Sequence, residues 1–181
     1  MNRREALLVL AGTAALPDQL LAVGRTVHNK IRAGTLRALT PQQNETVATI
    51  AELIIPKTDT PGAREAGVPA FIDVMLADWA DDEQRQMFTA GLANVDERSR
   101  TAFGKTFVGC TPEQQTEILE DLDYELARLR DTKSDTSKNF FSAMKWLTLT
   151  GYYTSEVGAT SEQHFRVVPG RYEPCYPLEQ Q

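Results

Sequence analysis

The sequence predicts an all-α protein, with about five helices in one bundle-like domain of residues 25–150 and a long irregular C-terminal tail of residues 151–181. Apolar residues recur at the three- and four-residue spacing of a helix, and few segments alternate with the two-residue period of a strand. With 41% apolar residues in 181, the chain can bury a core of its own. We therefore expect a single compact domain with appendages at both ends.

The first residues combine two arginines with an apolar run. Arg3 and Arg4 precede the run from residue 6 to 16, which is too short to span a bilayer but has the length of a signal-peptide core. Adjacent arginines before such a core are typical of a twin-arginine signal, which serves proteins exported in the folded state. We expect residues 1–24 to be this signal; a soluble amphipathic helix is the alternative.

The first helix of the domain is expected to begin at Thr40. Thr40 as N-cap, Pro41 at the first helical position and Gln43 three residues after the cap form a capping signature. Pro56 ends this helix, because proline lacks the backbone N–H that a helix needs. The segment KTDTPGAREAGVPAF, residues 57–71, is too rich in turn-forming residues for regular structure, so it is either a plain connector or a contact surface.

Three further helices are indicated by caps and apolar spacing. The first resumes near Pro69, and its expected buried face is Phe71, Ile72, Met75, Leu76 and Trp79. The second starts at Asp81 and Asp82, and its apolar face is Met87, Phe88, Leu92 and Val95. The third follows a second capping signature at Thr111 and carries Ile118, Leu119, Leu122, Leu126 and Leu129.

A last helix is expected to end near Gly151 and to give way to the tail. Its large side chains are Phe140, Phe141, Met144, Trp146 and Leu147. Three prolines between residues 169 and 177 exclude a long helix beyond it. Because the tail is too apolar for a disordered segment, it either folds back over the helices or lies against another protein. Its apolar residues are Phe165, Val167, Val168, Tyr172 and Tyr176.

The two cysteines, Cys110 and Cys175, each lie near a proline in an expected loop. In an oxidising compartment they could pair. An intrachain disulfide, a bridge to another chain and two free thiols all remain open. Two cysteines alone cannot hold an iron–sulfur cluster.

The charge and motif inventory excludes several classes of function. The net charge of −6 comes from acids and bases mixed along the chain, which argues against a nucleic-acid or anionic-membrane surface. The sequence has no haem motif, dinucleotide loop, Walker loop or Glu-x-x-His pair. We therefore expect no cofactor, no metal and no catalytic residues in this chain. The alternative is a stand-alone periplasmic hydrolase or isomerase that uses Tyr153, Glu156 and His164, with Ser155 as a candidate nucleophile.

Three long blocks of the chain resemble the gluconate 2-dehydrogenase subunit 3 family. They are LTPQQNETVATIAELIIPKTDTPGAREAGVPAFID, WLTLTGYYTSEVGAT and PGRYEPCYPL. The resemblance implies a non-catalytic small subunit whose large partner is an FAD-dependent oxidoreductase of the glucose–methanol–choline type, often with a cytochrome c as electron acceptor. It also implies that the twin-arginine signal of this chain brings both subunits through the translocase to the periplasm. Attachment to the membrane through the partner or an uncleaved signal stays open.

The resemblance also directs attention to residues that contact the partner. Tyr152 and Tyr153 follow the expected helix end, where one can face the core while the other offers its hydroxyl outward. Together with Gly151 and three tail residues they form our hypothetical partner interface, completed by Tyr172, Cys175 and Tyr176. A self-associating periplasmic helical protein without a flavin partner is the remaining alternative.

Overall fold

The computed structural model describes residues 35–163. These residues form five α-helices, labelled α3 to α7, with a 3₁₀-helix, η1, before α6 and a π-helix, η2, after α7. No strand occurs within residues 35–163, so the predicted all-α fold is confirmed. The bounds are α3 Pro41–Ile54, α4 Val68–Asp78, α5 Asp82–Phe103, η1 Phe107–Gly109, α6 Pro112–Asp131, α7 Phe140–Tyr153 and η2 Gly158–Glu162.

The predicted helix starts are confirmed by their hydrogen bonds. Thr40 Oγ1 accepts the backbone N–H of Gln43 at 3.2 Å, and Gln43 Oε1 accepts the N–H of Thr40 at 2.9 Å. The same reciprocal pair follows Thr111 at the start of α6. Asp81 caps α5 in this way together with Gln84. Each pair satisfies two backbone donors that the first helical turn would leave without a partner.

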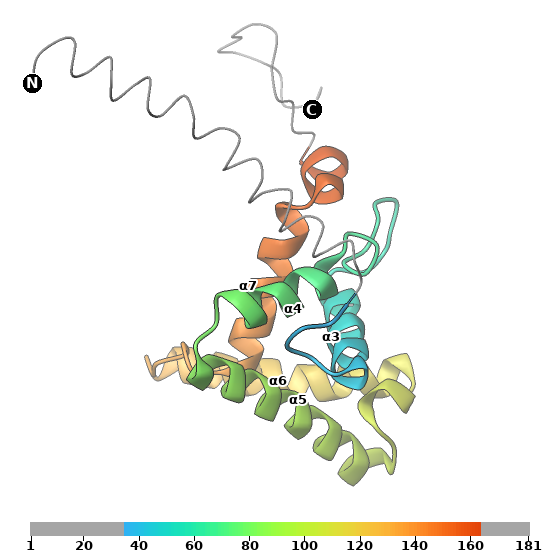
Figure 1. Cartoon of the computed structure of the whole chain (residues 1–181). Helices are drawn as coiled ribbons and strands as arrows, with labels where there is room; N and C mark the ends of the chain where they lie inside the picture. Colours follow the sequence, from blue (N-terminus) through green and yellow to red (C-terminus); the bar gives the residue numbers. More distant parts are fainter. Residues whose placement is uncertain (1–34, 164–181) are drawn as a thin grey trace, which may run out of the picture. The chain divides into compact units, whose positions relative to one another are not determined.

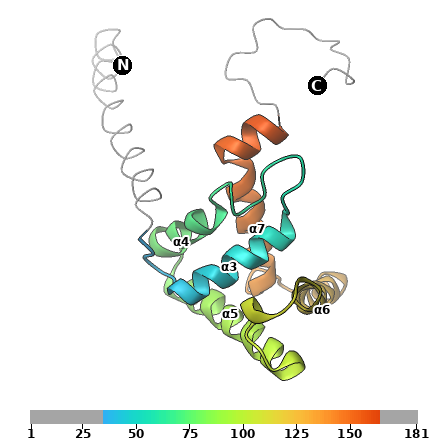
Figure 2. The same cartoon turned by 90° about the vertical axis from the view of Figure 1, so that its right-hand side faces the viewer.

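Helix α7 joins the packing of the whole domain, because it contacts α3, α4, α5 and α6. Figure 1 shows α7 running upright behind α4, with α5 and α6 across the lower part, and Figure 2 shows α3 passing in front of α7. Phe88 of α5 meets Phe140 of α7 edge to face, with ring centroids 5.2 Å apart. The largest fully buried side chains include Tyr152, Phe88, Phe107, Ile50, Ile72, Leu126 and Met144.

A buried carboxylate fixes the chain where it enters α3. Asp73 of α4 is 3% exposed and accepts three successive backbone N–H groups, from Arg37 at 2.8 Å, Ala38 at 3.0 Å and Leu39 at 2.9 Å. The Arg37 guanidinium also donates two hydrogen bonds of 2.6 Å to Asp78 at the end of α4. A buried carboxylate needs such donors to offset its lost hydration. The segment before α3 is therefore held against α4.

The end of α4 contradicts one prediction about the core. Trp79 was expected on the buried face, but its side chain is 76% exposed. Helix α4 ends at Asp78, and the N–H groups of Trp79 and Ala80 both donate to the carbonyl oxygen of Met75. Helical spacing would bury Trp79 only if α4 continued through it. Because the helix ends one residue earlier, the indole lies at the surface.

Helix α7 ends at Tyr153, two residues later than the expected end near Gly151. The chain then turns and forms η2, so regular structure continues past the expected start of the tail as far as Glu162. In Figure 1, η2 lies beyond the C-terminal end of α7. The part of the predicted tail from residue 164 onward lies outside the described residues.

Candidate functional site

Tyr152 and Tyr153 divide between the core and the surface, as predicted. Tyr152 is 2% exposed, and its hydroxyl donates to the carbonyl oxygen of Pro61 at 2.8 Å. Tyr153 is 40% exposed, and its ring stands at 87° to that of Tyr152 with centroids 5.4 Å apart. Tyr152 therefore belongs to the core, and only Tyr153 remains available to a partner.

Gly151 is buried within α7, so the structure does not place it at a surface. A Cβ atom at this position would come within 2.7 Å of the Phe71 ring of α4. Glycine allows α7 and α4 to approach at this point because it has no side chain. Gly151 therefore serves the packing of α7 against α4. It does not end the helix, which continues to Tyr153.

Several sequence-predicted residues lie outside the described residues: Arg3, Arg4, His164, Tyr172, Cys175 and Tyr176. Cys110, in contrast, is described, and its side chain is buried between η1 and α6. The proposed pair Cys110–Cys175 stays a prediction because Cys175 falls in the part of the chain that the structure does not describe.

The candidate nucleophile Ser155 has a structural role in the turn after α7. Its hydroxyl donates to the carbonyl oxygen of Tyr152 at 2.6 Å and accepts the backbone N–H of Gly158 at 3.0 Å. Both contacts hold the turn that leads into η2. Glu156, the candidate acid, has an exposed side chain, and the Ser155 hydroxyl bonds backbone groups of Tyr152 and Gly158. The arrangement of Ser155 and Glu156 in the described residues therefore does not support the alternative of a stand-alone enzyme.

Residues 35–163 show neither a cluster of metal-ligating side chains nor a membrane-spanning helix. No group of three or more His, Cys, Asp or Glu side chains lies close enough to hold a metal ion within this part of the chain. Among the same residues, no helix is long and apolar enough to cross a membrane.

The loop between α3 and α4 is fixed to its neighbours. The Glu52 carboxylate of α3 accepts the backbone N–H of Lys57 at 3.1 Å and of Arg64 at 2.9 Å. At the far side, Thr60 Oγ1 donates to Glu162 of η2 at 3.1 Å, and Tyr152 bonds Pro61 as described above. The loop joins α3 to α4 along the chain, and its hydrogen bonds also tie it to α7 and η2.

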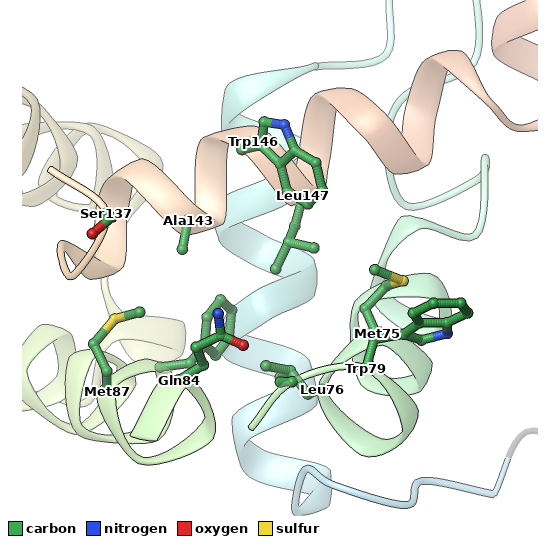
Figure 3. Close-up of a pocket in the computed structure, with 11 residues that line it drawn as sticks. Met75, Leu76, Trp79, Gln84, Met87, Ser137, Ala143, Trp146 and Leu147 are labelled. Atoms are coloured by element: carbon green, nitrogen blue, oxygen red, sulfur yellow. The ribbon is translucent and has the colours of Figure 1, made fainter. Parts of the chain in front are cut away.

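A pocket of about 180 Å³ opens between α4, α5 and α7. Its eleven lining residues are Met75, Leu76, Trp79, Ala80, Gln84, Met87, Phe88, Ser137, Ala143, Trp146 and Leu147. Figure 3 shows Trp146 and Leu147 reaching from α7 on one side, and the side chains of α4 and α5 on the other. The lining includes no acid, base or thiol, so it is suited to apolar contact rather than to proton transfer.

Large apolar side chains face solvent at this pocket, which Trp79 and Trp146 line, and further along α7 at Leu149 and Tyr153. Trp79 is 76% exposed, Trp146 58%, Leu149 46% and Tyr153 40%. Residues 146, 149 and 153 share one face of α7, because their spacing of three and four is the helical repeat. We call these four side chains and the pocket the two-tryptophan surface. Exposed apolar clusters of this kind mark sites of protein contact.

Charged groups at the edge of this surface pair with one another. Lys138, next to the pocket residue Ser137, donates to Glu83 at 2.6 Å, and this hydrogen bond raises the pKa of Lys138. Arg85 donates to the carbonyl oxygens of Leu76 and Ala80, both at 3.0 Å, and so fixes the corner between α4 and α5. The pocket is therefore framed by a rigid, hydrogen-bonded corner.

This surface was not predicted from the sequence. Trp79 was placed in the core by helical spacing, and the pocket joins residues 75–88 to residues 137–147, which are distant in the sequence. A signal was available on α7, where Trp146, Leu149 and Tyr153 repeat at helical spacing on one face.

The comparisons with known proteins give one family. Residues 41–170 match the family described as Gluconate 2-dehydrogenase subunit 3. Neither the comparison with curated proteins nor the comparison with solved structures finds a match. The matched residues include every residue of the two-tryptophan surface.

Proposed function

Because the chain belongs to the gluconate 2-dehydrogenase subunit 3 family, we propose that it is the non-catalytic subunit that exports, assembles and stabilises the catalytic subunit of a dehydrogenase complex. Membership in this family implies a catalytic partner subunit. That partner is, in our proposal, an FAD-dependent oxidoreductase of the glucose–methanol–choline type, and a cytochrome c subunit is a further partner.

The observation that supports a holding role is the two-tryptophan surface. Two indoles face solvent at a pocket that has no acid or base in its lining, and a leucine and a tyrosine face solvent further along α7. Such a surface provides binding energy but no general acid–base chemistry. The catalytic residues of the complex then belong to the partner.

The export role rests on the first residues. Arg3 and Arg4 stand before a short apolar run, which is typical of a twin-arginine signal. Flavin is acquired in the cytoplasm, so a flavin-loaded partner must cross the membrane folded, and one signal per complex is sufficient. Periplasmic localisation of both chains follows from this proposal.

Co-purification tests the proposal. This chain is tagged and expressed in its host with the neighbouring genes, and the visible spectrum and mass of the retained protein are recorded. We expect a second, larger chain with flavin absorption bands. A single colourless chain would contradict the proposal, and turnover of a substrate by that isolated chain would establish the stand-alone enzyme.

Fractionation tests the export role separately. The double substitution Arg3→Lys with Arg4→Lys should leave both chains in the cytoplasm. The matched control, Arg25→Lys with Arg32→Lys, makes the same change outside the predicted signal and should leave export intact. Export of both chains from the first variant would remove the twin-arginine role.

A further inference from the structure

We propose that the two-tryptophan surface is the docking site for the catalytic subunit and that the pocket between Trp79 and Trp146 takes one phenyl-sized apolar side chain of that subunit. This inference rests on the proposed function, because it names the part of this chain that holds the partner. It assigns the contact to α4, α5 and α7.

The volume of the pocket sets the size of the group that fits. An apolar cavity of roughly 150 Å³ in another protein binds benzene. The pocket here measures about 180 Å³, so it accommodates one aromatic or large aliphatic side chain. Met75 and Met87 line it from α4 and α5, and methionine adapts readily to the shape of an apolar guest. In Figure 3 these two side chains lie on opposite sides of the pocket.

The frame of the pocket is already rigid before a partner binds. Arg85 Nε and Nη2 hold the carbonyl oxygens of Leu76 and Ala80, both of which line the pocket. Gln84, also in the lining, is held by the capping bonds with Asp81. A site that is ordered in advance loses less conformational entropy on binding. The rigid corner thus favours a specific anchor over loose apolar adhesion.

The charges beside the pocket indicate that the anchor is apolar. Lys138 pairs with Glu83 at 2.6 Å, and Arg85 pairs with Asp82 at 3.3 Å. These charges are neutralised within the chain. A partner therefore contacts an apolar centre with a balanced rim, the arrangement found in specific protein interfaces.

Family membership favours a different protein over a second copy of this chain as the occupant of this surface. An aromatic side chain has about 150–250 Å² of surface. Because the three aromatic side chains and Leu149 are between 40% and 76% exposed, the four together expose roughly 400 Å². A standard interface buries about 800 Å² per partner, and obligate homodimers and permanent heteromeric complexes both bury considerably more. The surface has the size of the apolar centre of a heteromeric interface. Membership in a subunit family supplies the partner that would cover it.

Binding of the catalytic chain to immobilised full-length variants tests the inference. The double substitution Trp79→Ala with Trp146→Ala should weaken binding about tenfold or more, as loss of interface anchors does. Tyr124→Ala is the matched control: Tyr124 is an aromatic residue of α6 with 68% exposure, and it does not line the pocket. This control should bind like the wild type.

A second variant keeps the test informative if the double substitution impairs folding. Ala143→Phe adds a ring from α7 into the pocket while both indoles remain. We expect it to weaken binding by a similar factor with a normal melting curve. Wild-type affinity in both Ala143→Phe and a folded double variant would overturn the inference and leave the proposed function standing.

Three other outcomes also decide the question. Failure of the wild type to bind the catalytic chain overturns both the inference and the proposed function. A homodimer in light scattering that only the tryptophan variants abolish, with partner affinity unchanged, assigns the surface to a second copy and overturns the inference. Tryptophan fluorescence distinguishes the last case. If the double substitution Phe165→Ala with Tyr172→Ala changes the fluorescence and addition of the catalytic chain does not, residues 164–181 occupy the surface, and the inference is overturned.

Discussion

The inner and outer faces of α7 differ in what their large side chains contact. On the inner face, Met144 is fully buried and Tyr152 is 2% exposed with its hydroxyl bonded to Pro61. On the outer face, Trp146, Leu149 and Tyr153 are each at least 40% exposed. Both faces are apolar, but this chain encloses the side chains of the inner face, whereas those of the outer face keep 40% or more of their surface exposed to solvent.

This difference separates stability from binding along a single helix. Burying apolar area stabilises a fold, and side chains left in water contribute little to it. The stability of the described domain therefore does not explain why the residues on the outer face are apolar. In our account they serve the catalytic subunit, so substitutions on the two faces should affect different measurements.

The largest expected effect is that of Tyr152→Ala. Removing this buried ring leaves a cavity and an unsatisfied carbonyl oxygen at Pro61, which should lower the free energy of unfolding by about 3–5 kcal/mol. Tyr153→Ala, one residue later on the exposed side, should cost no more than about 1 kcal/mol, mainly from the lost ring pair. Urea unfolding measures both. Equal costs would show that the two faces are not distinct.

A smaller loss is expected from Gly151→Ala. The added methyl group would meet the Phe71 ring within 2.7 Å, and overpacking of this kind costs about 1–3 kcal/mol. Phe71→Leu in the same chain should recover part of the loss, because it makes room for the methyl group. A double-mutant cycle measures this coupling. Additive costs would mean that α7 and α4 are not in tight contact at this point.

Tyr152→Phe should have a milder effect. It keeps the buried ring but removes the hydrogen bond to Pro61 in the loop between α3 and α4, at a cost of about 1 kcal/mol. Hydrogen exchange should show faster opening of residues 57–63 than in the wild type. Unchanged exchange in this loop would indicate that its other hydrogen bonds, to Glu52 and Glu162, are sufficient to hold it.

The smallest effect on stability is expected on the outer face. Trp146→Ser and Leu149→Ser should each change the free energy of unfolding by no more than about 0.5 kcal/mol, the usual range for surface positions. The melting temperature of the isolated chain measures this. A loss of several degrees in either variant would place these side chains in the core and contradict their assignment to a partner.

The helices could be predicted from sequence because their signals are local. Thr40 with Gln43 and Thr111 with Gln114 each form a capping box within four residues, and both are present in the structure. Apolar spacing likewise predicted most of the buried faces of α5 and α6, although Met87 and Leu129 are only half-buried. The family resemblance, drawn from whole blocks of sequence, is confirmed by the match over residues 41–170.

The binding surface could not be predicted because it depends on where α4 ends and on contacts between distant segments. Helical spacing assigns Trp79 to the core only if α4 continues, and the helix ends at Asp78. The α7 sequence FFSAMKWLTLTGYY is apolar on most sides, so its pattern alone does not tell which residues α3, α4 and α5 will cover. Gly151 was assigned to a helix end for a similar reason, since its contact with Phe71 is tertiary.

The most direct test of the docking surface uses the two tryptophans of the chain, Trp79 and Trp146, which both line the pocket. Labelling this chain with 5-fluorotryptophan gives two fluorine NMR signals, which Trp79→Phe and Trp146→Phe assign. On addition of the unlabelled catalytic subunit, we predict that both signals shift and lose their sensitivity to exchange of H₂O for D₂O. Formation of the complex with both signals unchanged would contradict the account, because the partner would then bind elsewhere on the chain.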